Sequence, residues 1–285
     1  MNKVSLDSLT GVSETLLIPL FCRVWEHEEA RPIIRDAFAH ALGQRLLPLL
    51  QASDQLFHQA IVRRQWPEQV QIFMALRTRH FDQVTQDFLR RHSQCQVVML
   101  GCGLDSRYER LAHPDVAWYN LDLPAVIALR EQIFEPHDRV ANLAMSALDS
   151  AWLEVLDPDL PTLVLAEGLL MYLPRPQIRQ IYSLLAKHLH GEFLAEAVAN
   201  WAVVPLSRLV LQLALRLDAG TRYAGGLRSA QEPATWHPNL KLQGEWTYFS
   251  EREPRLGLLN LGTYTPFGRT QWVLHYQLGS PKAAR

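Results

Sequence analysis

The chain has 285 residues, of which 48% are hydrophobic and 20% are charged, a composition typical of a globular protein with a sizeable core. A formal net charge of −1 gives no overall basic character for binding nucleic acid, and the apolar stretches are shorter than the ~18 residues of a membrane span. The three cysteines contain no CxxC pair, so neither a disulfide framework nor a metal site is expected.

Residues 1 to about 94 are predicted to be helical. The first residues, MNKVSLDSLTGVSETLL, lack the apolar run and cleavage site of a signal peptide, and we expect a cytoplasmic protein. Apolar residues then recur at helical spacing in 29–50 and in 67–92. We expect this part to form a helical extension that packs on the domain that follows.

From residue 95 onward, short apolar runs alternate with longer segments that can form crossover helices. Strands alternating with helices predict βαβ units and a parallel sheet, and strands that are apolar throughout predict a sheet covered on both faces. The predicted strands are residues 95–100, 116–124, 140–147, 161–174 and 191–198.

The last third departs from this pattern. Residues 205–217 are amphipathic and precede a Gly-rich stretch, 218–233, so the region is interpreted as an inserted lid. Residues 240–250 and 269–279 predict a terminal antiparallel pair of strands. The lid is expected to dock through the apolar residues of its helix, which are Leu206, Leu209, Val210 and Leu213.

The first predicted strand ends in Gly101-Cys102-Gly103, where glycine permits a tight turn and close approach of the backbone to a ligand. Asp122 ends the next strand, 19 positions after Gly103, which is the distance of a ribose-binding acid. Ser106 replaces the third glycine of a dinucleotide fingerprint and disfavours NAD. A nucleoside such as S-adenosylmethionine is favoured, and a plain strand–helix turn is the alternative.

Three stretches, VVMLGCGLDSRYERL, WYNLDLPAVIALR and VLAEGLLMYLP, resemble in this order the leucine carboxyl methyltransferase family, and most of all its bacterial branch of tetracenomycin polyketide O-methyltransferase-like proteins. The resemblance covers about residues 11 to 200. It implies an α/β, Rossmann-like class I methyltransferase that uses S-adenosylmethionine. The implied sheet has seven mostly parallel strands with an antiparallel C-terminal pair. Residues 1–94 would form the helical extension, and 95–285, with the lid at about 201–245, the rest of one structural unit.

The resemblance also implies which residues bind the cofactor. Gly101 and Gly103 would approach its methionine part, and Asp122, with Leu123 beside it, would take both ribose hydroxyls. Arg77 would pair with the cofactor's carboxylate, with Arg79 as the second choice.

The acids and hydroxyls that follow the later strands are also assigned by the resemblance. Glu167 would lie near the cofactor's amino group. Ser146 stands where many relatives have an Asp that touches the adenine amino group, and the backbone N–H of Ala147 can donate to the ring. Tyr172 is a candidate contact for the acceptor, with a core tyrosine as the alternative.

Two nearby charges receive a structural interpretation. We expect Asp105 and Arg107 to charge and pair the N-terminus of the helix that opens after the glycine turn.

The spacing of the His, Lys and Asp residues in the sequence singles out none of them as a general base. A carboxylate acceptor needs none, whereas a phenol or an alcohol does. We therefore expect an enzyme that methylates a carboxylate of a small molecule, plausibly a polyketide or another secondary metabolite. A phenol acceptor, a protein C-terminus as the acceptor, an NAD(P)-dependent oxidoreductase and a non-catalytic S-adenosylmethionine binder remain alternatives. A monomer and a homodimer are both open.

Overall fold

The computed structural model describes residues 11–111 and 116–279, so the first ten residues, part of the segment examined for a signal peptide, lie outside it. Its N-terminal part is helical from residue 11 to residue 91. The elements there are the 3-10 helix η1 (Gly11–Leu16) and the helices α1 (Leu17–His27), α2 (Ala37–Gln51), α3 (Leu56–Val62) and α4 (Glu68–Arg91).

Seven strands form one sheet in the order β3-β2-β1-β4-β5-β7-β6. The first five strands of the chain are parallel, and β7 runs antiparallel between β5 and β6. The predicted fold, a mostly parallel seven-stranded α/β sheet with an antiparallel C-terminal pair, is confirmed. The strands are β1 (Gln96–Leu100), β2 (Ala117–Asp122), β3 (Val140–Ala144), β4 (Thr162–Ala166), β5 (Gly191–Val198), β6 (Leu240–Trp246) and β7 (Gln271–Leu278).

The connections contain less α-helix than the sequence predicts. The crossover expected over residues 148–156 is a 3-10 helix, and the helix after the glycine turn has only five residues. The helices that follow β1 in the chain are α5 (Arg107–Leu111), α6 (Pro124–Ile133), η2 (Ser150–Val155), η3 (Leu170–Tyr172), α7 (Arg175–His188), η4 (Asn200–Ala202), α8 (Val203–Leu206), η5 (Ser207–Ala214), η6 (Glu232–Thr235), η7 (Pro254–Tyr264) and η8 (Pro266–Arg269).

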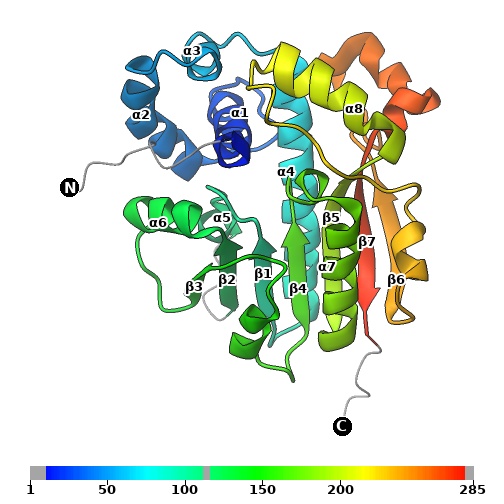
Figure 1. The fold of residues 1–285 in the computed structure, drawn as a ribbon. Helices are drawn as coiled ribbons and strands as arrows, with labels where there is room; N and C mark the ends of the chain where they lie inside the picture. Colours follow the sequence, from blue (N-terminus) through cyan, green and yellow to red (C-terminus); the bar gives the residue numbers. More distant parts are fainter. Residues whose placement is uncertain (1–10, 112–115, 280–285) are drawn as a thin grey trace.

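The sheet is covered on both faces, as the apolar strands predict. In β1, Val97 and Met99 belong to the same hydrophobic cluster as the buried side of α4. Val98 and Leu100, which point to the opposite face, pack in the cluster that contains α7. Figure 1 shows α4 and α7 running along the sheet on either side of it.

The N-terminal helices and the lid lie beyond the carboxyl ends of the parallel strands. In Figure 1, α1, α2 and α3 stand above the arrowheads of β1, β2 and β4, with α8 beside them. One hydrophobic cluster joins α1, α2 and α3 to α6 and to the C-terminal half of the lid helix. These helices therefore cover this end of the sheet, which is where ligands bind in open α/β folds.

The lid helix turns inward only two of the four apolar residues predicted to dock it: Leu206 is buried and Val210 packs against the core. Leu209 and Leu213 are 61% and 70% exposed, whereas Leu206, Leu211 and Leu215 are buried. The reason is that η5 is a π-helix, in which i→i+5 hydrogen bonds replace the i→i+4 pattern. The wider turn moves the inward positions along the chain, so the prediction for Leu209 and Leu213 is wrong.

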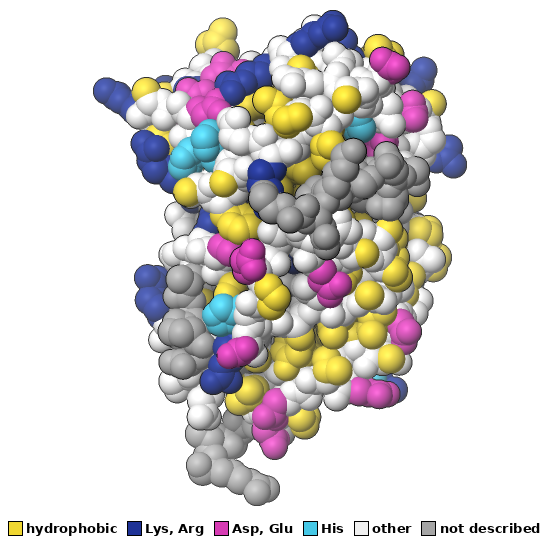
Figure 2. Space-filling model, turned by 90° about the vertical axis from the view of Figure 1, so that its left-hand side faces the viewer, with side chains coloured by type: hydrophobic (Ala, Val, Ile, Leu, Met, Phe, Trp, Pro, Cys, Tyr) yellow, Lys and Arg dark blue, Asp and Glu magenta, His cyan; other side chains and the backbone are white. Residues whose placement is uncertain are grey.

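The surface shows no membrane-spanning element in the part of the chain that the structure describes, since none of its helices combines the required length and hydropathy. On the face in Figure 2, Lys and Arg side chains are scattered among acidic and apolar ones. The described atoms of this face therefore form no continuous basic patch of the kind that binds nucleic acid.

Candidate cofactor-binding and active site

A cavity of about 600 Å³ lies beyond the carboxyl ends of β1, β2, β3 and β4, under the N-terminal helices and the lid. Segments far apart in the sequence line it, from η1 at one end of the chain to the residues just before β7 at the other. The structure brings together around this one cavity the nine preferred candidates, which are Arg77, Gly101, Gly103, Asp122, Leu123, Ser146, Ala147, Glu167 and Tyr172. Arg79, the second choice for the cofactor's carboxylate, does not line the cavity and pairs with Glu251.

The turn after β1 depends on its two glycines. Gly101 and Gly103 have φ angles of +65° and +49°, a region that side chains with a Cβ rarely adopt. A Cβ on Gly101 would also lie 3.0 Å from Cδ1 of Leu169, on the loop after β4. The glycines therefore let the backbone bend at the floor of the cavity before α5 begins at Arg107.

Asp122 ends β2 with its carboxylate beside this turn. Its Oδ2 accepts the backbone N–H of Gly103 at 2.8 Å, and its Oδ1 accepts that of Leu123 at 2.7 Å. Burial raises the pKa of Asp122, while the two N–H donors act in the opposite direction. Each oxygen keeps lone pairs, so the group can still accept two hydroxyl donors from a ligand.

The loop after β3 contributes the other predicted contacts of the nucleoside. Ser146 Oγ accepts the backbone N–H of Leu148 at 3.2 Å, which fixes the hydroxyl near the cavity wall. Ala147 and Leu148 pack against the hydrophobic cluster of the sheet. Farther along, Asp149 caps η2 by accepting the N–H of Ala151 at 3.0 Å.

Arg77, on α4, is held by two acids from different strands. Its Nε donates to Oε1 of Glu167 at 2.9 Å, and its Nη1 donates to Oε2 of Glu196 at 2.8 Å. Glu196 also accepts the N–H of Gly168 at 2.8 Å and the hydroxyl of Tyr248 at 2.6 Å. Two edges of the guanidinium are therefore fixed within the protein, and Arg77 and Gly168 both line the cavity.

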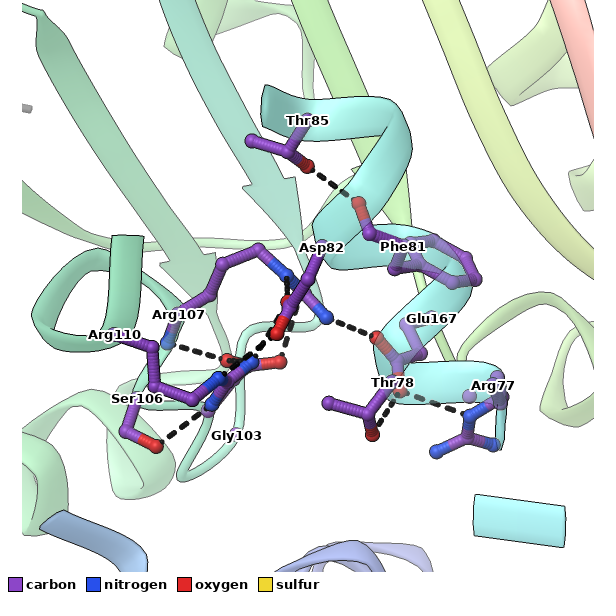
Figure 3. Close-up of polar contacts among 12 residues, drawn as sticks. Arg77, Thr78, Phe81, Asp82, Thr85, Gly103, Ser106, Arg107, Arg110 and Glu167 are labelled. Carbon is purple, nitrogen blue, oxygen red and sulfur yellow. Dashed lines mark hydrogen bonds and ion pairs between the residues drawn. The ribbon is translucent and has the colours of Figure 1, made fainter. Parts of the chain in front are cut away.

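Glu167 is also held from its other side, as Figure 3 shows. Its Oε2 accepts a hydrogen bond from Nη2 of Arg107 at 2.7 Å. Nε of Arg107 in turn donates to Oδ1 of Asp82, on α4, at 2.7 Å. Burial would raise the pKa of Glu167, but the guanidinium groups of Arg77 and Arg107 hold it below its ordinary value. Glu167 is therefore an ionised, oriented carboxylate and not a proton carrier at neutral pH.

Asp105 and Arg107 pair at the helix N-terminus as predicted, with Nη1 of Arg107 3.0 Å from Oδ2 of Asp105, but Arg107 does more than this. Asp105 does accept the N–H of Arg107 at 2.6 Å, at the start of α5. The Arg107 side chain, however, is fully buried and reaches across to Glu167. Arg107 thus orients Glu167 and compensates its buried negative charge, which would otherwise be costly to remove from water.

Glu196 was missed by the sequence interpretation, although a signal was present. It is a fully buried acid inside β5, whose eight residues are all buried. Carboxylates are almost never placed in such a strand without a cation or several hydrogen-bond donors. The sequence does not indicate which cation, since Arg77 lies 119 residues away.

One part of the cavity lining is apolar and aromatic. Tyr172 and Tyr223 meet there edge to face, with ring centroids 5.4 Å apart. Burial raises the pKa of Tyr172 to about 12 and that of Tyr223 well above its ordinary value, so both hydroxyls stay protonated. The other residues of this part include Phe73, Met74, Leu206, Val210, Phe249 and Phe267.

Cations and bases are few in the lining. Among the described residues that line the cavity there is no His and no Lys, and the two cations are Arg23 and Arg77. Arg23 donates from Nε to Asp36 at 3.0 Å and from Nη2 to the carbonyl of Leu104 at 2.9 Å. Cys102 is buried, and burial raises the pKa of its thiol, so it is no nucleophile.

Known proteins share this sequence pattern. The profile of the leucine carboxyl methyltransferase family matches residues 17–186. The tetracenomycin polyketide synthesis O-methyltransferase TcmP of Streptomyces glaucescens is 30% identical over 241 residues, which cover 84% of each chain. The S-adenosyl-L-methionine-dependent methyltransferase dpfgK of Gibberella zeae is 29% identical over 256 residues, which cover 82% of this chain and 81% of the relative.

Solved structures share the fold at low sequence identity. A DUF574-family protein from Streptomyces avermitilis superimposes with a TM-score of 0.55 at 13% identity, covering 90% of this chain and 96% of its own. The family match and the relatives together identify the cofactor as S-adenosylmethionine and exclude the oxidoreductase alternative. The chain thus belongs to the leucine carboxyl methyltransferase family, and it is a Rossmann-like, S-adenosylmethionine-dependent methyltransferase.

Proposed function

We propose that this methyltransferase is an O-methyltransferase that esterifies the carboxylate of an apolar small molecule, such as a polyketide or another secondary metabolite. The observation that carries the proposal is the scarcity of bases: the described lining has no His or Lys, and its acids are engaged. Glu167 and Glu196 are paired with Arg77, and Asp122 accepts two backbone N–H groups. An acceptor that is already ionised needs no base.

The cofactor residues fit this role, and their assignments are part of the proposal. The positive φ angles of Gly101 and Gly103 bend the backbone at the floor of the cavity, where a ligand would approach it. Asp122 would accept the ribose hydroxyls, and Arg77 would meet the cofactor's carboxylate through Nη2. Glu167, ionised and fixed by two arginines, would meet its ammonium group.

The chemistry requires alignment and exclusion of water. When bound, S-adenosylmethionine supplies a methyl group on a positively charged sulfur. As the bond from the acceptor oxygen to the methyl carbon forms, the sulfur–carbon bond breaks, its electron pair stays on sulfur, and both charges disappear. The protein would hold the reacting atoms about 3 Å apart, and its apolar walls would remove the water that stabilises the separated charges.

A small acceptor suits the cavity better than a protein tail does. Leu206, Val210 and Leu211 of the lid form part of the cavity wall, so this part of the lid covers the place where an acceptor would bind. A protein C-terminus, the acceptor of the first alternative, would need a broad open groove. The relative TcmP is named as an enzyme of polyketide synthesis, which also supports a small acceptor.

Ser146→Asp is expected to strengthen cofactor binding by roughly 3- to 10-fold, because a carboxylate accepts the adenine amino hydrogen more strongly than a hydroxyl does. Calorimetric titration of S-adenosylhomocysteine into both proteins measures the change. Ser250→Asp, outside the cavity, is the control for added negative charge. Unchanged or weaker binding in Ser146→Asp alone would contradict the placement of the adenine beside residue 146.

The pH dependence of kcat/KM is expected to be flat between about pH 6 and about pH 9. An acceptor carboxylic acid with a pKa of about 4 is ionised throughout this range. Glu167, whose pKa is held below its ordinary value, is also ionised, and Tyr172, with a pKa of about 12, stays protonated. Initial rates at saturating S-adenosylmethionine test this. A rate that rises through this range would indicate a general base and a hydroxyl acceptor.

The acceptor class can be tested with methyl-labelled S-adenosylmethionine and matched compounds. Aromatic carboxylic acids, the corresponding phenols and a peptide ending in leucine would be compared as acceptors. Methyl esters release methanol in mild alkali, whereas aryl methyl ethers do not, so base-labile label on the small acids is the expected result. Label that is stable to alkali, label confined to the peptide, or no transfer at all would each contradict the proposal.

A further inference from the structure

The Gly-rich stretch after the lid helix forms an extended segment, residues 221–227, which we call the strap. Its backbone crosses the ends of two central strands. The N–H groups of Ala224 and Gly225 donate to the carbonyl of Met171 at 2.7 and 3.3 Å, and the N–H of Leu227 donates to that of Val198 at 2.9 Å. The strap is therefore fixed to the loop after β4 and to the end of β5.

The glycines of the strap make this close approach possible. A Cβ on Gly225 would lie 2.3 Å from the carbonyl oxygen of Leu173, and one on Gly226 would lie 2.6 Å from that of Val198. Both distances are far below van der Waals contact with backbone that cannot move away. The glycine pair thus sets the path of the strap across the sheet end.

Tyr223 is the residue that the strap places in the cavity. Its backbone N–H donates to Oγ of Ser207 at 2.9 Å, and that hydroxyl donates to the carbonyl of Val203 at 2.8 Å. Its ring meets Tyr172 edge to face. The side chain is therefore held by the lid helix on one side and by the loop after β4 on the other.

The hydroxyl of Tyr223 is suited to donate to an anion. Two other donors of the cavity already serve buried acids: the Tyr248 hydroxyl donates to Glu196, and Nε and Nη1 of Arg77 donate to Glu167 and Glu196. Within the described part of the chain, no acceptor is hydrogen-bonded to the Tyr223 hydroxyl. Because it stays protonated, it can offer its hydrogen to a carboxylate without adding a second positive charge to the site.

We propose that Tyr223 is a specificity-determining residue, whose hydroxyl donates a hydrogen bond to the acceptor carboxylate, at the oxygen that is not methylated. This inference rests on the proposed function. An ionised oxygen that leaves water for an apolar cavity needs a donor, or it loses most of the affinity gained from its apolar part. The strap provides this donor from a segment in which the family resemblance is weakest.

The test compares Tyr223→Phe with the wild type, using naphthoate and anthracene carboxylate as acceptors and methyl-labelled S-adenosylmethionine as the donor. The kcat/KM for the acids is expected to fall by roughly 10- to 100-fold, the scale of one hydrogen bond to a charged group. The KM for S-adenosylmethionine and the Tm are expected to stay unchanged. Tyr264→Phe, whose ring is 85% exposed on η7, is the matched control and should behave as the wild type.

Each other outcome overturns a different statement. If the wild type methylates the acids and Tyr223→Phe does so equally well, the role of Tyr223 is wrong and the proposed function stands. If Tyr223→Phe also loses affinity for S-adenosylmethionine or melts earlier, the residue has a structural role and the inference is again wrong. If the wild type methylates phenols but not acids, both the proposed function and this inference are wrong.

Discussion

Asp122→Ala is expected to weaken the binding of S-adenosylmethionine by roughly 1.5–3 kcal/mol, or about 10- to 150-fold in Kd. The carboxylate stands at the end of β2 and accepts the N–H groups of Gly103 and Leu123. Its oxygens are thereby aimed at the turn that forms the cavity floor. Alanine removes both the proposed acceptor for the ribose and the support of the turn, and calorimetric titration with cofactor and product measures the loss.

Two further variants separate these contributions. Asp122→Asn keeps one oxygen for the N–H of Gly103 but accepts fewer ligand hydroxyls, so it should lose a large part of the affinity. Asp54→Ala removes an exposed acid away from the cavity and should bind as the wild type does. An unchanged Kd in Asp122→Ala would remove this residue from the ribose site.

The convergence of the proposed cofactor residues on one cavity could be predicted because it follows from local patterns and one topological rule. Short apolar runs specify the strands, and parallel strands bring their carboxyl ends to the same edge. Gly101, Asp122 and Glu167 each come at such an end, so they had to converge once the strand order placed β1 between β2 and β4. No knowledge of the side-chain contacts was needed.

The remaining parts depend on contacts between residues far apart in the sequence. Glu196 and Tyr248 are joined by a hydrogen bond across 52 positions, and nothing in either local sequence marks the partner. The inward face of the lid could not be predicted from a period of 3.6 residues, because its helix is a π-helix. Tyr223 lies in a stretch without hydrophobic periodicity. The backbone hydrogen bonds of the strap determine where its side chain points, and the sequence does not indicate them.

Arg77→Met is expected to lower the free energy of unfolding by about 3–5 kcal/mol, because it leaves buried carboxylates without their shared cation. Glu167 keeps Arg107, but Glu196 keeps only the N–H of Gly168 and the hydroxyl of Tyr248. Thermal and denaturant unfolding measure the loss. Arg79→Met is the matched control on the same helix, since its pair with Glu251 is partly exposed to water and contributes at most about 1 kcal/mol.

The sign of the pH dependence gives the same variant a second, independent test. In the wild type, the pKa of Glu167 is held below its ordinary value, so its contribution to stability is present above that value and is lost as the pH falls through the lowered pKa. Without Arg77 the pKa of Glu167 rises, because burial is then opposed by Arg107 alone. The difference in stability between wild type and Arg77→Met should therefore be largest near pH 7. It should shrink as the pH falls through the raised pKa of Glu167 in the variant and then through its lowered pKa in the wild type. Replacing Glu196 by Gln in the same chain should recover part of the loss at pH 7, since one uncompensated charge is gone. A deficit that is independent of pH and unaffected by Glu196→Gln would mean that Arg77 stabilises the fold by packing, and that the acids do not depend on its charge.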